Sequence, residues 1–242
     1  MAIQSISGCK ILIDGYDRSG DLNRVNLDYN ADELDSTTVG NTSKAFIAGL
    51  KSCKFDGEVF TSSGTGEVET VSAALFAVAD KLISVYPANA ATTPGYAFKS
   101  VELTNSPAME IGDIARLTIK ASQSGGALVR VTDMEGSATK TSTGTGTARL
   151  LGAASATQTL YSFLHVTAVS GTNTPTITVL VASDDAVGFA SPTTNLTHTA
   201  FTAVGAEMKS LAGANTDTYY RVAWTISGTN PSFTFTIGVG IL

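Results

Sequence analysis

The chain has 242 residues, of which 15% are charged and 7% aromatic, and its formal net charge is −6 at pH 7. That length suits two domains of about 100–150 residues and can bury a stable core without disulfides. The acidic balance excludes a protein that grips nucleic acid by neutralising phosphates, although it permits one that nucleic acid slides past.

The first half predicts β-strands separated by turns. We expect strands at Lys10–Tyr16 and Asn23–Tyr29, followed by a polar loop from about Ala31 to Ala48. The next strand alternates, since Cys53, Phe55, Gly57 and Val59 fall on one face and Lys54, Asp56 and Glu58 on the other. Strands place successive side chains on opposite faces. This strand therefore predicts a sheet with one face on a core and one face on water.

One helix is expected after this strand, over about Glu69–Ile83. Its apolar residues recur at helical spacing, and two glutamates lie near its N-terminal end, where the helix dipole favours negative charge. Two further strands are predicted at residues 96–103 and 113–122. In the second of them Arg116, Thr118 and Lys120 again alternate with apolar residues.

The second half is poor in charge and predicts strands at residues 161–169, 175–183, 218–226 and 232–241. Of the 15 Lys/Arg and 21 Asp/Glu residues, only 3 and 4 follow residue 140. A Thr/Ser/Gly-rich stretch lies between the halves and is typical of a linker. We therefore predict a domain over 1–136, a linker over 137–149 and a second domain over 150–242.

A short echo links Val169–Val179 with Ile226–Ile237, because both contain Ser-Gly-Thr-Asn, a proline and a Thr-alternating strand. We interpret the two copies as two similar hairpins. The second domain is expected to be a jelly-roll-like β-sandwich, and the fold class is therefore mainly β.

Little in the sequence points to chemistry. His165 shares a strand face with aromatic residues and is interpreted as a packed histidine, and His198 has no carboxylate or cysteine near it in sequence. Asp184–Asp185 could contact Ca²⁺, but one carboxylate pair is more typical of a solvated loop. No nucleophile elbow, phosphate-binding loop or clustered metal ligands occur. We expect no enzyme, no catalytic residue, no metal and no cofactor.

Cys9 and Cys53 both lie in expected strands and are interpreted as reduced core thiols. The N-terminus lacks the pattern of a secretory signal. The longest apolar run, about seven residues from Ala73, is far below the ~20 residues of a membrane helix. We expect a soluble protein that is made in a cytoplasm and has no membrane partner.

The first half resembles the major tail tube proteins of long-tailed, non-contractile (siphovirus-like) bacteriophages. The resemblance covers roughly residues 8–135 and rests on Asp35–Gly40 followed by SKAFIAGLK, the Phe55-containing strand, the helix and the late strand GDIARLTIKAS. The second half resembles, less specifically, C-terminal β domains appended to phage virion proteins.

The resemblance implies a tail-tube-type β-sandwich or split barrel with one flanking helix. Such subunits join edge to edge into rings, usually six-fold, and the rings stack into a tube in the virion tail, where they meet other phage tail proteins. DNA passes through the tube during ejection without specific binding. The C-terminal domain is then expected to decorate the outside of the tube.

Two sets of site residues follow from that role. Asp28, Asp56 and Glu58 are the candidates for an acidic lumen, tempered by or paired with Lys54, Arg116 and Lys120. The candidates for contacts between subunits are Val39, Gly40, Asn41, Phe46, Ile47 and Leu50. In an alternative reading, Phe46, Ile47 and Leu50 cap the core of their own domain.

Two other virion roles stay open: a capsid decoration protein, and an adhesion protein that binds host-surface glycans. An adhesion protein predicts a groove lined by Trp224, Tyr219 or Tyr220. Alternation instead groups Tyr220, Val222 and Trp224 on one strand face, which favours a place in the core.

Overall fold

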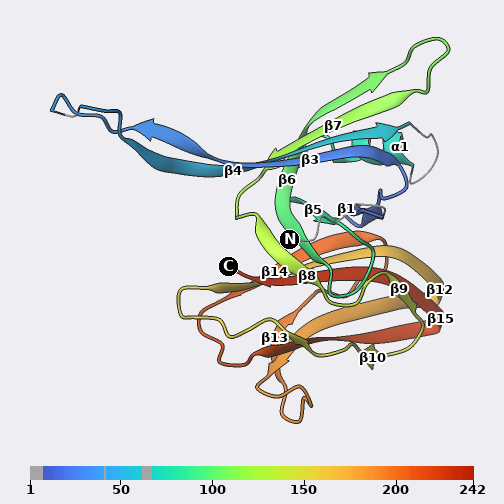
Figure 1. The fold of residues 1–242 in the computed structure, drawn as a ribbon. Coiled ribbons are helices and arrows are strands. Elements are labelled where there is room, and N and C mark those ends of the chain that lie inside the picture. The colour runs from blue at the N-terminus through green and yellow to red at the C-terminus, as the bar shows by residue number, and fades with distance from the viewer. Residues whose placement is uncertain (1–7, 41, 62–66) are drawn as a thin grey trace. The chain divides into compact units, whose positions relative to one another are not determined.

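The computed structural model describes residues 8–40, 42–61 and 67–242. The fold is mainly β, as predicted. Its elements in chain order are β1 (Lys10–Ile13), β2 (Tyr16–Asp17), β3 (Leu22–Asp35), β4 (Phe46–Phe60), α1 (Val68–Leu75), β5 (Lys81–Tyr86), β6 (Pro94–Ala108), β7 (Arg116–Gln123), β8 (Val129–Asp133), β9 (Ala138–Lys140), β10 (Gly144–Thr145), β11 (Arg149–Leu150), β12 (Thr159–Asp184), β13 (Thr193–Thr197), β14 (Gly205–Ala212) and β15 (Tyr219–Ile241) (Figure 1).

The chain forms two compact units. Unit 1 contains the described residues up to Gly20, together with Lys81–Phe98 and Val129–Leu242, and unit 2 contains the described residues of Asp21–Asp80 and Lys99–Leu128. This division differs from the predicted boundary at residue 136, because β1, β5 and β8 belong with the C-terminal half of the chain. Contacts between distant strands decide the division, and local composition carries no signal of them.

Unit 2 is built on an antiparallel sheet in the order β3–β4–β7–β6. Its apolar face carries the buried side chains of Phe55 and its cross-strand partner Ala121, and the half-buried Leu27 of β3 lies opposite Phe55. The buried Glu102 of β6 shares this face, since it pairs with Ala121. The Ser72 hydroxyl of α1 donates a 2.6 Å hydrogen bond to Glu102. The helix therefore covers the apolar face, and the other face stays open.

The prediction of a helix over Glu69–Ile83 is wrong beyond Leu75. Ala77 and Asp80 have φ angles of 59° and 62°, in the left-handed region, and the chain then enters strand β5. Residues with positive φ interrupt a right-handed helix. The apolar spacing that suggested four helical turns therefore combines a short helix with the first residues of a strand.

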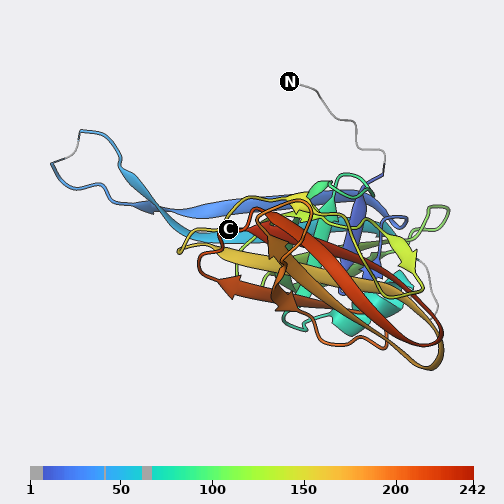
Figure 2. The ribbon, with the colours of Figure 1, turned by 90° about the horizontal axis from the view of Figure 1, so that it is seen from below.

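Unit 1 is dominated by a ribbon of two very long antiparallel strands, β12 and β15, which pair from Leu160↔Ile241 to Asp184↔Tyr219. The ribbon folds back on itself, so that its two halves lie in two layers (Figures 1 and 2). One hydrophobic cluster joins both halves, from Leu164 and Phe235 in one layer to Val179 and Trp224 in the other. The predicted C-terminal sandwich is thus formed by one folded ribbon.

The two Ser-Gly-Thr-Asn copies form the bend of this ribbon. The expected pair of separate hairpins is wrong, because the two copies lie opposite each other, with Thr172 paired to Thr229. Gly171 and Gly228 have φ angles of +128° and +115°, and a Cβ on Gly228 would stand 2.8 Å from the Cα of Pro175. Both glycines are needed here because L-residues rarely adopt such angles. The echo therefore marks one corner built from two matching halves.

The expected linker over 137–149 is also ordered within unit 1. Its short strands β9, β10 and β11 all pair with β15. The Nε1–H of Trp224 donates to the carbonyl of Ser142 over 2.9 Å, and Lys140 lies 4.4 Å from the Trp224 ring centroid. Backbone pairing to a long neighbouring strand orders this segment even though its own side chains are small and polar.

A second core lies on the opposite face of β12. Phe163 packs there against Leu12, Tyr86 and Val131, with other residues of β5, β6 and β8. This contact explains why the first strand of the chain belongs to unit 1. Cys9 in unit 1 and Cys53 in unit 2 are both free thiols.

Candidate functional site: the open face and the arm of unit 2

The open face of the unit 2 sheet carries a regular pattern of opposite charges. The pairs across β3 and β4 are Asp28 opposite Lys54 and Arg24 opposite Glu58, and the pair across β4 and β7 is Asp56 opposite Lys120. Alternation along each strand places these side chains on the face that α1 does not cover. The three predicted lumen residues, Asp28, Asp56 and Glu58, therefore lie together on one face.

Two of these acids form ion pairs. Lys120 Nζ lies 3.2 Å from Asp56 Oδ2, and Arg116 Nη1 lies 3.0 Å from Glu58 Oε1. A hydrogen bond from Asn23 and then the one from Arg116 lower the pKa of Glu58, which keeps this carboxylate ionised. The expected pairing of Arg116 and Lys120 with these acids is confirmed.

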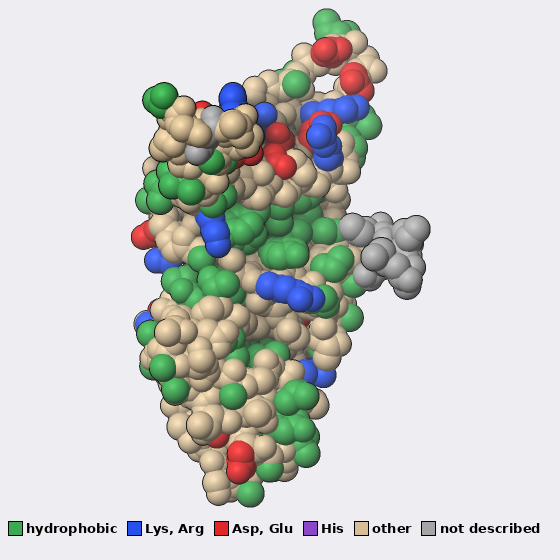
Figure 3. All heavy atoms as spheres, turned by 60° about the vertical axis from the view of Figure 1, so that its left-hand side comes forward, with side chains coloured by type: hydrophobic (Ala, Val, Ile, Leu, Met, Phe, Trp, Pro, Cys, Tyr) green, Lys and Arg blue, Asp and Glu red, His purple; other side chains and the backbone are tan. Residues whose placement is uncertain are grey.

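The open face is consequently mixed in charge. Each of the three acids has a basic side chain opposite or beside it, so the acidic wall expected from the sequence does not form on this face in the isolated chain. Basic and acidic side chains also lie close to one another in the space-filling view (Figure 3). Exposed pairs of this kind contribute only about 0–1 kcal/mol each to stability. These pairs neutralise the charge of the open face and contribute little to the stability of the fold.

Beyond this sheet, β3 and β4 continue as a two-stranded arm, which we define as the described residues of 30–52. The pairing of β4 with β7 begins only at Lys54, whereas β3 and β4 stay paired as far as Asp35 and Phe46. Of the expected polar loop from Ala31 to Ala48, residues 31–35 and 46–48 therefore belong to the two strands, and the described residues between them form the connection. The arm extends from the sheet as a long ribbon (Figure 1).

The arm exposes apolar side chains on both of its faces. Leu34 and Ile47 are cross-strand partners and are 50% and 58% exposed, while Phe46 and Leu50 are 51% and 81% exposed. Val39 is fully exposed at the tip. Phe46, Ile47 and Leu50 thus do not cap the core of their own unit, and that alternative is wrong. Gly40 is also exposed, and Asn41 lies outside the described residues.

Sequence reasoning missed a second exposed apolar tip. Met109, Ile111 and Ile114 lie in and beside the connection between β6 and β7, and they are 67%, 110% and 61% exposed. The segment SPAMEIGDI carries its apolar residues irregularly, so no period distinguishes it from a loop that folds back on the core. Unit 2 therefore presents apolar residues at the ends of two hairpins.

His198 has no carboxylate near it in sequence, but the fold brings Glu207 beside it. Its Nδ1 lies 2.9 Å from Glu207 Oε2, and its Nε2 lies 2.8 Å from the Ser162 hydroxyl. Burial lowers the pKa of His198 to about 4 against the opposing charge of Glu207. The hydrogen-bonded series Ser162–His198–Glu207 has the same order of residue types as a hydrolase triad. Ser162 is fully buried, however, and His198 is only 2% exposed, so a substrate has no access to this serine.

The other predicted polar sites are structural as well. His165 is buried between Gly15 N at 3.2 Å and the Ser84 hydroxyl at 2.9 Å, and burial lowers its pKa to about 3. Asp184 accepts backbone hydrogen bonds from Ala186 and Ser191, both at 2.9 Å. This carboxylate therefore stabilises the conformation of its own loop. Within the described part of the chain, no group of three or more His, Cys, Asp or Glu residues is placed to hold a metal ion.

Two of the three aromatic residues proposed for a glycan groove lie in the core instead, and the third, Tyr219, is half-buried. Tyr220 is fully buried and Trp224 is 6% exposed. A shallow hollow of about 330 Å³ in unit 1 is lined by Arg130, Leu150 and neighbouring residues and contains no aromatic ring. Among the described residues, no helix is both long and apolar enough to cross a lipid bilayer.

No protein-family model matches the chain, and no curated protein matches it. Similar solved structures include a chain of the virion of a native gene transfer agent particle, with 14% identity, a TM-score of 0.44, and coverage of 53% of this chain and 98% of that one. A chain of the tail of an empty gene transfer agent particle with C6 symmetry has 16% identity and a TM-score of 0.38, covering 46% and 81%. The Dit protein of SPP1, described as a hub adsorption apparatus of phages that infect Gram-positive hosts, has 11% identity and a TM-score of 0.37, covering 97% and 99%.

Proposed function

We propose that this protein is a structural subunit of a phage-type tail and that copies of it join into rings through unit 2. The observation that carries the proposal is the arm, a two-stranded ribbon with Leu34, Phe46, Ile47 and Leu50 exposed. An isolated two-stranded hairpin is only marginally stable in water. Several exposed apolar side chains gathered on one such element mark an interaction site. A second copy of the chain is the occupant that also satisfies the sheet edges.

The unit 2 sheet has two open edges that suit each other. Among the described residues, β3 pairs only with β4, and the stretch of β6 from Leu103 to Ala108 pairs only with β7. In the order β3–β4–β7–β6 each strand is antiparallel to the next. The β6 edge of one copy would therefore run antiparallel to the β3 edge of the next copy. A closed ring would leave no unpaired edge to aggregate.

The dimensions of such a ring allow a bore. In the six-fold case, twenty-four strands about 4.8 Å apart and tilted by about 40° form a barrel about 48 Å across, and inward side chains leave roughly 35 Å open. The open charged face would line this bore, because α1 occupies the other face. Opposite charges that neutralise each other neither bind nor strongly repel phosphates, so DNA would pass without being held.

We further propose that the protein is not an enzyme and that unit 1 serves as a decoration on the assembly. The only Ser–His–Glu chain among the described residues is closed to solvent at Ser162. A decoration of this kind needs a stable and weakly charged surface, and the two cores of unit 1 with its few charged residues fit that need. The localisation that follows is the virion tail.

Electron microscopy and sedimentation of the full chain test the proposal. The wild-type protein should form rings or short tubes at high concentration. Ile47→Asp should leave single subunits with an unchanged circular dichroism spectrum, because it places a charge in the apolar arm contact. The matched control is Val187→Asp, since Val187 is 64% exposed in unit 1 and should not affect rings. Single subunits of the wild type at all concentrations, or rings in Ile47→Asp, would contradict the proposal.

A further inference from the structure

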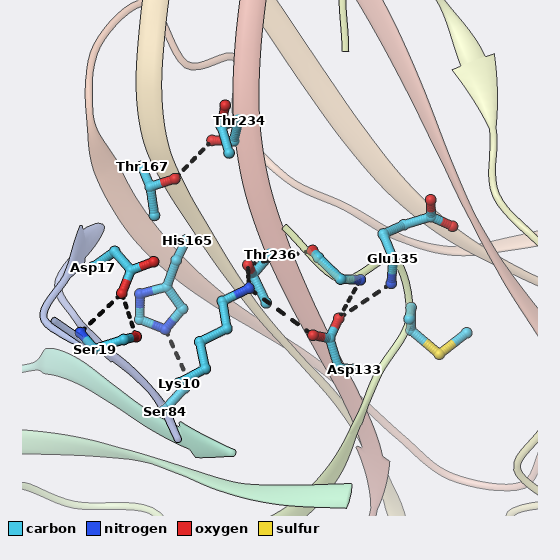
Figure 4. A network of polar contacts seen from close by, with 12 residues as sticks. Lys10, Asp17, Ser19, Ser84, Asp133, Glu135, His165, Thr167, Thr234 and Thr236 are labelled. Carbon is cyan, nitrogen blue, oxygen red and sulfur yellow. Dashed lines mark hydrogen bonds and ion pairs between the residues drawn. The ribbon is translucent and has the colours of Figure 1, made fainter. Parts of the chain in front are cut away.

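A lysine and an aspartate lie side by side in the interior of unit 1, sealed from water. Lys10 of β1 and Asp133 at the end of β8 both have fully buried side chains, and Lys10 Nζ lies 4.0 Å from Asp133 Oδ2. Lys10 Nζ also donates a hydrogen bond to the Thr236 hydroxyl of β15 (Figure 4). Three strands distant in sequence thus meet at this pair.

The two oxygens of the Asp133 carboxyl have different surroundings. Oδ1 accepts backbone hydrogen bonds from Gly136 at 2.8 Å and Glu135 at 3.1 Å. Oδ2, the oxygen nearer to Lys10, has no hydrogen-bond partner among the described residues. Two N–H groups aimed at one carbonyl oxygen are the arrangement that stabilises negative charge in acyl transfer. The carboxyl is therefore polarised toward Oδ1 and open on the side of the amine.

The surroundings also favour the uncharged forms of both groups. Burial lowers the pKa of Lys10, against the opposing charges of Asp133 and Asp17. Burial raises the pKa of Asp133, against the opposing charges of Lys10 and Arg149 and its two backbone hydrogen bonds. A neutral amine is a nucleophile and a neutral carboxylic acid can lose its hydroxyl, so both pKa shifts act in the direction that acyl transfer requires.

We propose that Lys10 and Asp133 condense into an intramolecular isopeptide bond that joins β1 covalently to β8. The Nζ lone pair attacks Asp133 Cγ, and the negative charge forms on Oδ1, where the N–H groups of Glu135 and Gly136 stabilise it. One proton passes from Nζ to Oδ2, the bond from Cγ to Oδ2 breaks, and one water molecule leaves. An amide remains, and no atom is oxidised or reduced.

An unreacted ion pair is the alternative, and its geometry is poor. The 4.0 Å separation gives no direct hydrogen bond between the two charged groups, and Asp133 Oδ2 is left unsatisfied. The attraction of a buried pair repays the loss of hydration only when the two charges are close and every remaining polar atom is satisfied, and Oδ2 is not. The condensed form removes both charges from the interior and leaves one amide.

Intact-mass spectrometry of the purified, folded full chain tests this inference. After prolonged incubation the protein should be lighter than its sequence by the mass of one water molecule, and a tryptic digest should contain one branched peptide that holds Lys10 and Asp133. Lys81 and Asp14 serve as the internal control, because their Nζ–Oδ2 distance is only 2.8 Å but both side chains reach solvent. Their peptides should stay separate.

Asp133→Asn gives a second and independent readout. An amide side chain in the same position would release ammonia in place of water, so the mass deficit should change accordingly, whereas Lys10→Met should abolish it. Should either variant fail to fold, the wild-type measurement still decides. A folded wild-type protein with its full sequence mass and separate Lys10 and Asp133 peptides overturns the inference.

Discussion

Replacing Glu102 by Gln should stabilise unit 2 at alkaline pH and leave it unchanged at acidic pH. Glu102 is only 5% exposed, and it lies on the apolar face of the sheet beneath α1. Burial raises its pKa to about 7, although the hydrogen bond from Ser72 lowers it in part. Glutamine has nearly the same shape, keeps an acceptor for the Ser72 hydroxyl and carries no charge.

The magnitude follows from proton linkage. Between about pH 4.5 and pH 7 the folded state binds more protons at Glu102 than the unfolded state, so stability falls as the pH rises. A pKa difference of about 2.5 corresponds to about 3 kcal/mol, which is fully present below about pH 4.5 and lost above about pH 7. Glu102→Gln should therefore exceed the wild type by about 2–3 kcal/mol at pH 8 and match it at pH 4.5.

Denaturant unfolding of both proteins at pH 4.5 and pH 8, followed by far-ultraviolet circular dichroism, measures this difference. Trp224 is the single tryptophan and lies in unit 1, so its fluorescence reports separately on the unit that should not respond. Glu33→Gln on the exposed arm is the control for loss of a surface carboxylate. An equal gain at both pH values, or no gain at pH 8, would refute the reasoning.

Three further predictions concern other parts of the molecule. His198→Gln should flatten the pH dependence of the stability of unit 1. The wild type loses up to about 3 kcal/mol of unfolding free energy as the pH falls from 6.5 to the folded pKa of His198, about 4. Trp224 fluorescence during unfolding measures this, and the same dependence of stability on pH in both proteins would contradict it. Gly228→Ala should cost more than about 2 kcal/mol in the same assay, since strain and contact with the neighbouring backbone add. Gly152→Ala, with φ of +92° and open space around it, should cost only about 1 kcal/mol, and equal losses would refute the account of the corner. Lys120→Ala should change stability by less than about 1 kcal/mol at any salt concentration, and a larger loss in thermal unfolding would show that the open face holds the fold together.

Some features of this molecule were readable from alternation alone. In the strand around Phe55, the alternation of apolar and charged residues predicts which face is buried and which is charged. The structure places Asp56 and Glu58 on one open face, as expected. The core position of Trp224 was predicted in the same way. These features depend on which way neighbouring side chains point, and period two determines that within a single strand.

Other features depend on pairing between residues far apart, and the sequence could not show them. Glu207 lies beside His198 because β14 and the end of β13 both lie next to Ser162 of β12. No local spacing in the sequence predicts this contact. The same holds for Lys10 and Asp133. The linker over 137–149 was misjudged for a related reason, since its order comes from backbone pairing with β15 and its side chains carry no sign of it.

The arm is where local and long-range reasoning meet. Its sequence alternates too weakly to predict strands, yet its backbone stays paired from Ala31↔Lys51 to Asp35↔Phe46, with one register shift between Ala31 and Glu33. Its apolar side chains cannot be buried within the ribbon, because a two-stranded ribbon has no interior. Natural sheets usually protect such surfaces with charge, twist or a covering element, and this arm has Leu34 and Ile47 exposed where protection would be expected. In the proposed assembly a second copy covers this apolar surface, so there the order of the arm and the association of the subunits are two aspects of one equilibrium.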